Sequence, residues 1–422
     1  MRFKMFSLGC KVNSYECSAL ASLLINRGYI EDNDNPDVII INTCSVTATA
    51  DQKSRQHIRK FIKTYPNAIT VVMGCYAQGN AEYIANEIKP TILVGTSNRN
   101  KIPELIDEYL KTKQNIVLVD ADTRHFKYEE ICVTSFSENV RAYLKIQDGC
   151  NNFCSYCLIP YRRGCMRSRE AKDIIEEAHY LVKQNYNEIV LSGIHVGGYG
   201  QDLGNMSFSD LVEQLSNING LSRLRISSIE ESEIDDKLIN LIKNKDNLAK
   251  HLHIPLQSGS DTVLVRMNRK YNCEQFLNKL IKIKEEIPDV ALSTDVIVGF
   301  PGETEEEFNE TYNFIKQCGF NMLHVFPFSA REGTVAFNMK NQIDPQIKAL
   351  RAQSLIHLSN QLWDEYTDKY VGKTLSILIE KINNGVCYGH SSNYINIKFK
   401  NNNHKIGQFI DVKIQKDMIE SR

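Results

Sequence analysis

The feature that most constrains this chain is a short loop that carries Cys150, Cys154 and Cys157 in a C-x3-C-x2-C spacing. Three thiolates on one loop suit a cubane iron–sulfur cluster, because its irons favour cysteine sulfur. The next cysteine, Cys165, lies eight residues further on, so a fourth ligand at ferredoxin spacing is absent. One iron would then lack a protein ligand and could bind something else. The alternatives are a zinc knuckle or buried structural cysteines, although zinc usually takes a closed set of four ligands.

Residues 1–112 alternate strand-like and helical patterns, which predicts a doubly wound parallel sheet with helices on both faces. Cys10, Cys44 and Cys75 each come just after a predicted strand. In such a sheet the carboxyl ends of the strands converge on one crevice, so these three cysteines are expected to meet in space. One of them alone would be a buried small residue. Three at successive strand ends indicate a second cluster, again with one free iron. The predicted strands of this domain cover residues 4–8, 37–42, 69–73 and 91–94.

Residues 113–138 lack clear periodicity and are predicted to form a surface linker. Across 139–365 six strand–helix units follow, which favours a (βα)6 partial barrel with its chemistry at the carboxyl ends of the strands. The loop with Cys150 comes directly after the first of these strands, so it lies on that face. The predicted strands cover residues 141–146, 188–192, 223–227, 251–256, 291–298 and 321–326.

The tail, residues 366–422, alternates polar and apolar residues between Gly/Asn-rich turns, which predicts a small antiparallel β-barrel of about five strands. Residues 371–422 hold eight Lys/Arg and four acidic residues, a net charge of +4. Exposed His390, Asn393 and Tyr394 on such a barrel would suit an RNA backbone with stacked bases. The alternative is a solvated structural lid.

Composition limits the other possibilities. The chain has 422 residues and a net charge of −1, so it is not a globally basic nucleic-acid binder. Its start shows no signal peptide, and no apolar run is long enough to span a membrane. These features predict a cytoplasmic protein of two or three domains without a membrane partner.

Together the motifs resemble those of the methylthiotransferases, radical S-adenosylmethionine (SAM) enzymes that insert sulfur and a methyl group at an unactivated C–H bond. The resemblance covers essentially the whole chain: a three-cysteine domain over 1–112, a radical SAM domain over 139–365, and an RNA-binding TRAM domain over 366–422. The TRAM likeness rests on residues 372–374 and 389–394.

The three residues after Cys10, Lys11-Val12-Asn13, distinguish the branches of this family. They resemble those of the branch that acts on threonylcarbamoyladenosine at position 37 of tRNA. The branch acting on isopentenyladenosine typically has Gln-Met-Asn there, and the branch acting on an aspartate of a ribosomal protein has Pro-Lys-Asn. These two branches are the alternatives, in that order.

The resemblance implies two [4Fe-4S] clusters, with SAM as radical source and methyl donor. The cluster on Cys150, Cys154 and Cys157 would cleave SAM reductively, and the resulting radical would abstract hydrogen from C2 of the adenine. The other cluster would present the sulfur. The implied partners are the tRNA anticodon loop, an electron donor such as flavodoxin or ferredoxin, and a sulfur donor. A two-cluster electron carrier with an RNA-binding tail is the competing class, but such carriers complete each cluster with four ligands.

Two further sets of residues follow from the resemblance. The residues implied for SAM binding are Tyr156, Ser192, Gly193, Glu230, Gln257, Ile297 and Gly299. The residues implied for substrate binding are Arg162, Arg163, Arg331, Lys373, His390 and Tyr394.

Overall fold

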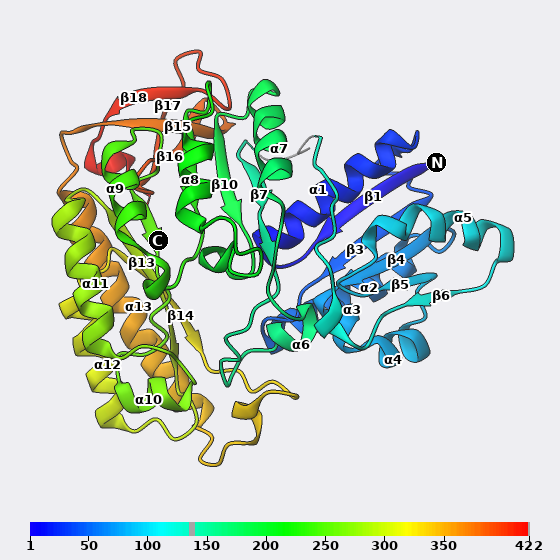
Figure 1. The fold of residues 1–422 in the computed structure, drawn as a ribbon, viewed down its shortest axis with the longest axis horizontal. Helices are drawn as coiled ribbons and strands as arrows, with labels where there is room; N and C mark the ends of the chain where they lie inside the picture. Colours follow the sequence, from blue (N-terminus) through cyan, green and yellow to red (C-terminus); the bar gives the residue numbers. More distant parts are fainter. Residues whose placement is uncertain (135–139, 421–422) are drawn as a thin grey trace.

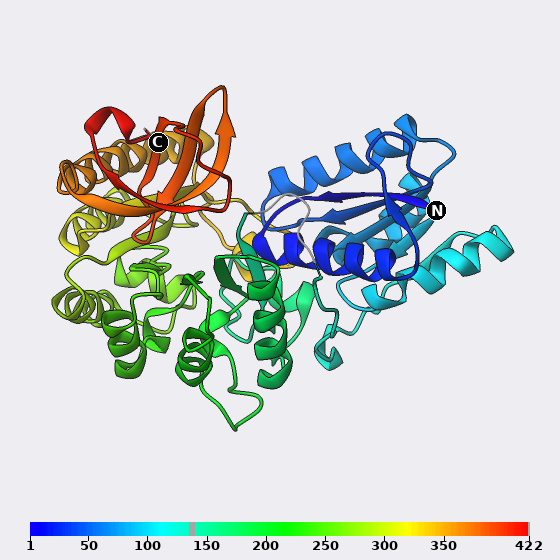
Figure 2. The same ribbon diagram turned by 90° about the horizontal axis from the view of Figure 1, so that it is seen from above.

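The computed structural model describes residues 1–134 and 140–420. Figure 1 shows the amino-terminal domain (blue to cyan) and the carboxy-terminal sheet (orange to red) on different sides of a central domain (green to yellow). The view from above in Figure 2 shows the same arrangement. The central domain therefore contacts both of the others.

The amino-terminal domain is a six-stranded parallel sheet in the order β2-β1-β3-β4-β5-β6. Its central strands β3 and β4 are buried along their whole length, as Val/Ile-rich strands covered on both faces should be. Helices α1 and α5 pack on one face through Leu24 and Ile106, and α2 packs on the other through Ile58 and Phe61. The doubly wound prediction is confirmed. The elements are β1 (Arg2–Ser7), α1 (Lys11–Asn26), β2 (Ile30–Glu31), β3 (Val38–Thr43), α2 (Ala48–Thr64), β4 (Ile69–Gly74), α3 (Cys75–Gly79), α4 (Ala81–Tyr83), a π-helix (Ile84–Ile88), β5 (Ile92–Val94) and α5 (Ile102–Thr112).

This sheet extends past residue 112 into the segment predicted to be a linker. Strand β6 (Ile116–Leu118) pairs in parallel with β5 at the edge of the sheet. Further along, Glu129 accepts a hydrogen bond from Arg99 at 2.6 Å, and Glu130 pairs with Arg169 of the central domain. Residues 129 and 130 of this segment thus contact both the amino-terminal and the central domain.

The central domain contains the six parallel strands in the predicted order. They form two three-stranded sheets, β11-β10-β7 and β12-β13-β14, which the parallel bridges Leu224–Leu248 and Ser228–His253 connect. The helices cover one face of this curved wall, and α13 packs along β14 (Figure 1). The elements are β7 (Ala142–Lys145), β8 (Gln147–Asp148), α6 (Ile159–Arg163), β9 (Arg167–Ser168), α7 (Ala171–Lys183), β10 (Glu188–Ser192), α8 (Phe208–Ser216), β11 (Arg223–Ile226), α9 (Asp236–Asn244), β12 (His251–His253), α10 (Asp261–Arg266), α11 (Cys273–Glu286), β13 (Ala291–Val298), α12 (Glu305–Cys318), β14 (Met322–Pro327) and α13 (Pro345–Asp368).

The carboxy-terminal domain is a small antiparallel sheet, as predicted, with four strands where about five were expected. Its order is β17-β16-β15-β18, and after β18 the described chain adds a single bridge, Ile397–Ile419, instead of a further ladder. Its core residues Ile377 and Ile395 pack against Trp363 and Tyr366 of α13. The strands are β15 (Thr374–Asn383), β16 (Val386–Ser391), β17 (Asn396–Lys400) and β18 (Phe409–Lys413).

Candidate active site

Cys10, Cys44 and Cys75 meet at one edge of the amino-terminal sheet, as the strand pattern predicts. They follow the neighbouring strands β1, β3 and β4, and their thiols are close enough to influence one another electrostatically. Gly9 has φ +101°, and a Cβ there would lie 2.7 Å from Cys44 Sγ, so glycine is needed for the close approach. Burial raises the pKa of Cys44 to about 11. Metal binding at these thiols would therefore release protons.

The loop with the other three cysteines lies at the carboxyl end of β7. The short strands β8 and β9 bracket it, and the Cys150 amide donates to the Gly164 carbonyl at 3.1 Å. The Cys157 amide donates to the Cys154 carbonyl at 2.9 Å, which closes a tight turn. Burial raises the pKa of Cys157 to about 12. The three half-buried sulfurs thus share one compact loop, which suits a cluster with three protein ligands.

Two cationic side chains that the sequence analysis missed surround this loop. Arg269 donates to Cys154 Sγ at 3.3 Å and pairs with Glu230. Burial alone would lower the pKa of His195, but hydrogen bonds to Cys150 and Glu233 raise it to about 10. Arg269 lies 115 positions from Cys154, and no motif links the two. His195 could have been found, because it closely follows the strand that ends at Ser192.

A buried charge network joins the two cysteine sets. Arg163, at the end of α6, donates to Cys75 Sγ at 3.2 Å, to Glu16 at 2.7 Å and to Asp148 at 3.2 Å. Glu16 belongs to α1 of the first domain, whereas Asp148 immediately precedes the cluster loop. Burial opposes ionisation of Glu16, but Arg163, Arg99 and Lys145 hold its pKa well below the usual range. Arg163 is fully buried, so the expectation that it contacts the substrate is wrong.

Most of the other arginines near the chemistry are also paired. Arg167 lies 3.1 Å from Asp148, and Arg169 pairs with Glu130 and Glu177. Arg331 is buried and donates to Asp51 at 2.5 Å, across the contact between the central and amino-terminal domains. Arg162 differs, because its Nε is buried without a hydrogen-bond partner in the described chain. Of the predicted substrate arginines, only Arg162 lacks a carboxylate partner there.

The residues expected to bind SAM gather at the carboxyl ends of the strands. Ser192 ends β10, and its Oγ is buried without a partner within the described ranges. Gln257 has φ +66°, and its carbonyl accepts from the Ile297 amide at 2.9 Å, which joins two of the expected residues. The other four hold comparable positions: Gly193 follows β10, Tyr156 lies in the cluster loop, Glu230 pairs with Arg269, and Gly299 follows β13. The structure therefore places all seven in the cluster loop or at the carboxyl ends of the barrel strands.

The carboxy-terminal residues expected to face RNA are instead packed against the central domain. His390 is 1 % exposed and lies 3.1 Å from Glu188 and 2.9 Å from Glu380. Asn393 is also buried, and Tyr394 is half-buried with its ring stacked on His251 at 4.7 Å. The expectation that His390, Asn393 and Tyr394 are exposed is wrong, because they close the amino-terminal ends of the barrel strands. Lys373 does remain exposed.

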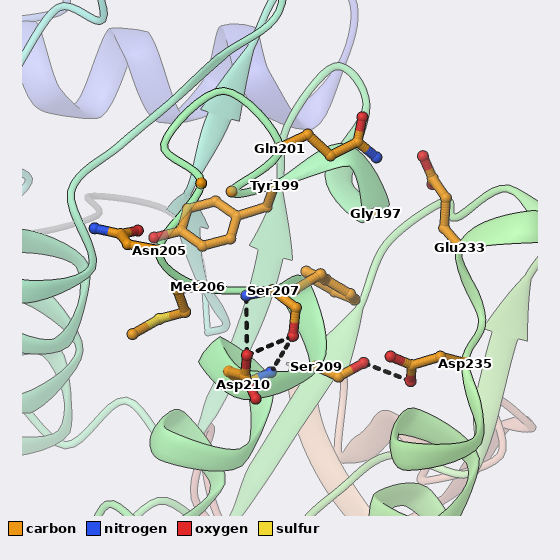
Figure 3. Close-up of a pocket in the computed structure, with 13 residues that line it drawn as sticks. Gly197, Tyr199, Gln201, Asn205, Met206, Ser207, Ser209, Asp210, Glu233 and Asp235 are labelled. Carbon is orange, nitrogen blue, oxygen red and sulfur yellow. Dashed lines mark hydrogen bonds between the residues drawn. The ribbon is translucent and has the colours of Figure 1, made fainter.

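A pocket of about 430 Å³ lies beside this site and not within it (Figure 3). Its lining includes Asp210, Glu233, Asp235 and Gln201, and no lysine, arginine or histidine. Ser207 caps α8 through Asp210, and Ser209 bonds Asp235 at 2.7 Å, so several of these polar groups are already satisfied. Such a pocket does not suit an anionic ligand.

None of the helices within residues 1–134 and 140–420 is long and apolar enough to cross a membrane.

Comparison with known proteins agrees with this division of the chain. Residues 2–95 match the Uncharacterized protein family UPF0004, residues 144–315 the Radical SAM superfamily, and residues 368–418 the TRAM domain.

Among curated proteins, the chain is 46% identical to the threonylcarbamoyladenosine tRNA methylthiotransferase MtaB of Bacillus subtilis (strain 168), covering 97% of this chain and 93% of that protein. It is 38% identical to the tRNA-2-methylthio-N(6)-dimethylallyladenosine synthase of Clostridium tetani, covering 97% and 93%. Among solved structures, the radical SAM methyltransferase TsrM of Kitasatospora setae has a similar fold, with a TM-score of 0.60 at 11% identity over 92% of this chain and 80% of that one.

Proposed function

This chain belongs to the radical SAM methylthiotransferase family, and we propose that it inserts a methylthio group at C2 of threonylcarbamoyladenosine 37 in tRNA. Two relatives named for this substrate, from Bacillus subtilis and Chlamydia pneumoniae, share 46% and 38% of their residues with the chain. The observation that carries the proposal is the presence of two three-cysteine sets joined through Arg163. Sulfur insertion needs one centre that generates a radical and a second that holds the sulfur.

Each set would bind one [4Fe-4S] cluster, with Cys10, Cys44 and Cys75 holding one and Cys150, Cys154 and Cys157 the other. When bound, the two clusters and SAM supply the reductive cleavage, the hydrogen abstraction at C2, and the sulfur and methyl groups. The cationic side chains next to the cysteines would stabilise the cluster ligands. Arg269 at Cys154, His195 at Cys150 and Arg163 at Cys75 donate hydrogen bonds that stabilise negative charge on these sulfurs.

The residues around the cluster loop would position SAM. The unpartnered Ser192 Oγ offers a hydrogen bond at the end of β10, and the lack of a side chain at Gly193 lets a ligand approach the backbone there. Glu230, held by Arg269, offers a carboxylate beside them. Gln257, Ile297 and Gly299 would contact the adenosine, and Tyr156 would pack beside the cluster.

The tRNA would bind across the carboxy-terminal sheet and the mouth of the barrel. Lys373, Lys398 and Lys400 are exposed on that sheet and suit phosphate contacts. Bases of an anticodon loop are unpaired, so position 37 can be turned out without melting a helix. The reaction also requires an electron donor such as flavodoxin or ferredoxin and a sulfur donor. With tRNA as its substrate, the protein would work in the cytoplasm.

The test is an anaerobic assay of the reconstituted protein on two tRNAs, one carrying threonylcarbamoyladenosine and one carrying isopentenyladenosine. Nucleoside mass spectrometry should find the 2-methylthio product only on the first. Comparable turnover of both tRNAs would overturn the substrate assignment. Failure to form 5′-deoxyadenosine from SAM would overturn the enzyme class and favour an electron carrier.

A further inference from the structure

The proposed substrate carries a threonine-derived carboxylate, and a site for it needs a cationic donor. This inference rests on the proposed function and asks which residue supplies that donor. The arginines near the proposed clusters are mostly unsuitable, since Arg163, Arg167, Arg169 and Arg331 already pair with carboxylates of the protein. A free cation must be sought elsewhere.

Lys11 is such a cation. It directly follows Cys10 and is the first residue of α1. Its side chain is exposed, and its ammonium has no carboxylate within ion-pair distance in the part of the chain that the structure describes. By contrast, Lys145 on the neighbouring strand β7 lies 2.9 Å from Glu16 and 2.7 Å from Asp148.

The surroundings of Lys11 include two arginines and a tyrosine. Lys11 lies near Arg141, Arg225 and Tyr394, close enough for their charges to act on it. Arg141 donates to the Tyr394 hydroxyl at 3.3 Å, and the Arg225 guanidinium lies 4.6 Å from the centre of the Tyr394 ring. Burial would raise the pKa of Tyr394, but Arg141, Lys11 and Arg225 lower it below its usual value. Arg141 and Arg225 already pair with Glu380 and Glu188, so Lys11 is the cation of this group that is left to bind an added anion.

Lys11 also lies at the hollow side of the barrel wall. Leu224 and Leu252 point into the core that the helices cover, so the alternate residues Arg225 and His251 face the other way. Tyr394 contacts both Arg225 and His251, which places it on this hollow face. Lys11 directly follows Cys10, so an anion bound beside it on this hollow face lies next to the amino-terminal cysteine set.

Arg162 is the other candidate, and its position is less suitable. Its guanidinium packs over Gly79 of α3, where a Cβ would collide with it. Its electrostatic neighbours include Asp51 and Glu332, whose negative charges would repel a carboxylate. Arg162 therefore fills the contact between α3 and α6, whereas Lys11 faces the hollow side of the barrel.

We propose that the ammonium of Lys11 binds the carboxylate of the threonylcarbamoyl group and thereby selects this substrate. The residue sits next to Cys10, so a substrate held by its carboxylate is kept beside the cysteine set that would deliver the sulfur. The same chemistry could instead bind a phosphate of the tRNA backbone, and the experiment separates these two anions.

The experiment measures the affinity of the reconstituted Lys11→Gln protein for one tRNA in two forms, with threonylcarbamoyladenosine at position 37 and as an unmodified transcript. Removing a charged hydrogen-bond donor should weaken binding of the modified form roughly 10- to 100-fold, with binding of the transcript unchanged. Lys11→Arg, which retains the charge, should restore most of the preference. Lys53→Gln, on the exposed face of α2, is the matched control and should change neither affinity.

Because the ratio of the two affinities is taken within one preparation, partial loss of a cluster does not change it. An unchanged ratio in Lys11→Gln, with a wild-type protein that prefers the modified tRNA, would overturn the role of Lys11. An equal loss for both tRNAs, with a smaller salt dependence, would assign Lys11 to a phosphate and also overturn it. A wild-type protein without any preference or methylthio product would instead show that the proposed function has failed.

Discussion

Replacing Arg163 by methionine should loosen the contact between the amino-terminal domain and the cluster loop. The substitution keeps a long apolar side chain but removes every hydrogen bond to Glu16, Asp148 and Cys75. Both carboxylates are almost fully buried, so neither can be solvated by water in compensation. The two buried carboxylates would then lose one of the four cations that pair with them, leaving Arg99, Lys145 and Arg167.

The size of the effect follows from the remaining partners. Breaking a buried ion pair by removing one member costs about 3–5 kcal/mol. Glu16 keeps Arg99 and Lys145, and Asp148 keeps Lys145 and Arg167, so the lower end, about 3 kcal/mol, is expected. For domains of this size, this corresponds to a fall in melting temperature of roughly 6 to 12 °C.

The assay combines thermal unfolding with hydrogen exchange read by mass spectrometry. Exchange should rise in α1 and in residues 147–163, the two sides of the contact. Arg124→Met is the control and should leave both measurements unchanged, since Arg124 is 76% exposed and its ion pair in the described chain is with the nearby Asp122. The Glu16 pKa is lowered by folding, so its contribution is present above the ordinary glutamate pKa and is lost as the pH falls through the folded value. Wild type and Arg163→Met should therefore converge in acid. A shift below about 2 °C at neutral pH would refute the reasoning.

Three further predictions concern the clusters and the RNA. Replacing Cys150, Cys154 and Cys157 together by alanine should leave about half of the iron and abolish SAM cleavage, and loss of all iron would contradict two separate sites. By contrast, Cys10→Ala, Cys44→Ala or Cys75→Ala should retain 5′-deoxyadenosine formation without methylthio product. In metal-free protein at pH 8, Cys44 should be alkylated roughly a hundredfold more slowly than an unperturbed thiol, because its pKa is about 11 instead of 9. Peptide mass spectrometry measures the labelling, and equal labelling of Cys44 and the exposed Cys165 would count against this prediction. Lys398→Gln with Lys400→Gln should weaken tRNA binding and lower the slope of log K against log salt by about 2 if both contact phosphate, and an unchanged slope in a filter-binding titration would remove them from the interface.

The sequence by itself determined the local structure and the positions of the ligands. Alternating apolar runs and amphipathic helices located the strands of the first two domains, because period two and period 3.6 are properties of short segments. The proximity of Cys10, Cys44 and Cys75 could be predicted from the sequence, because the carboxyl ends of parallel strands meet at one edge of the sheet. The only strand of that sheet hidden in the predicted linker, β6, is three residues long and shows no alternation.

Only the tertiary structure decided which polar side chains face the ligands. His390 reads as an exposed residue of a basic sheet, yet Glu188, 202 positions away, buries and binds it. Arg163 reads as a phosphate contact, yet Glu16, 147 positions away, turns it into the junction between two domains. Burial of a charge depends on the partners that packing brings to it, and no local pattern encodes them. The same packing leaves Lys11 without a carboxylate partner among the residues that the structure describes, although its sequence neighbourhood resembles that of any lysine at the start of a helix.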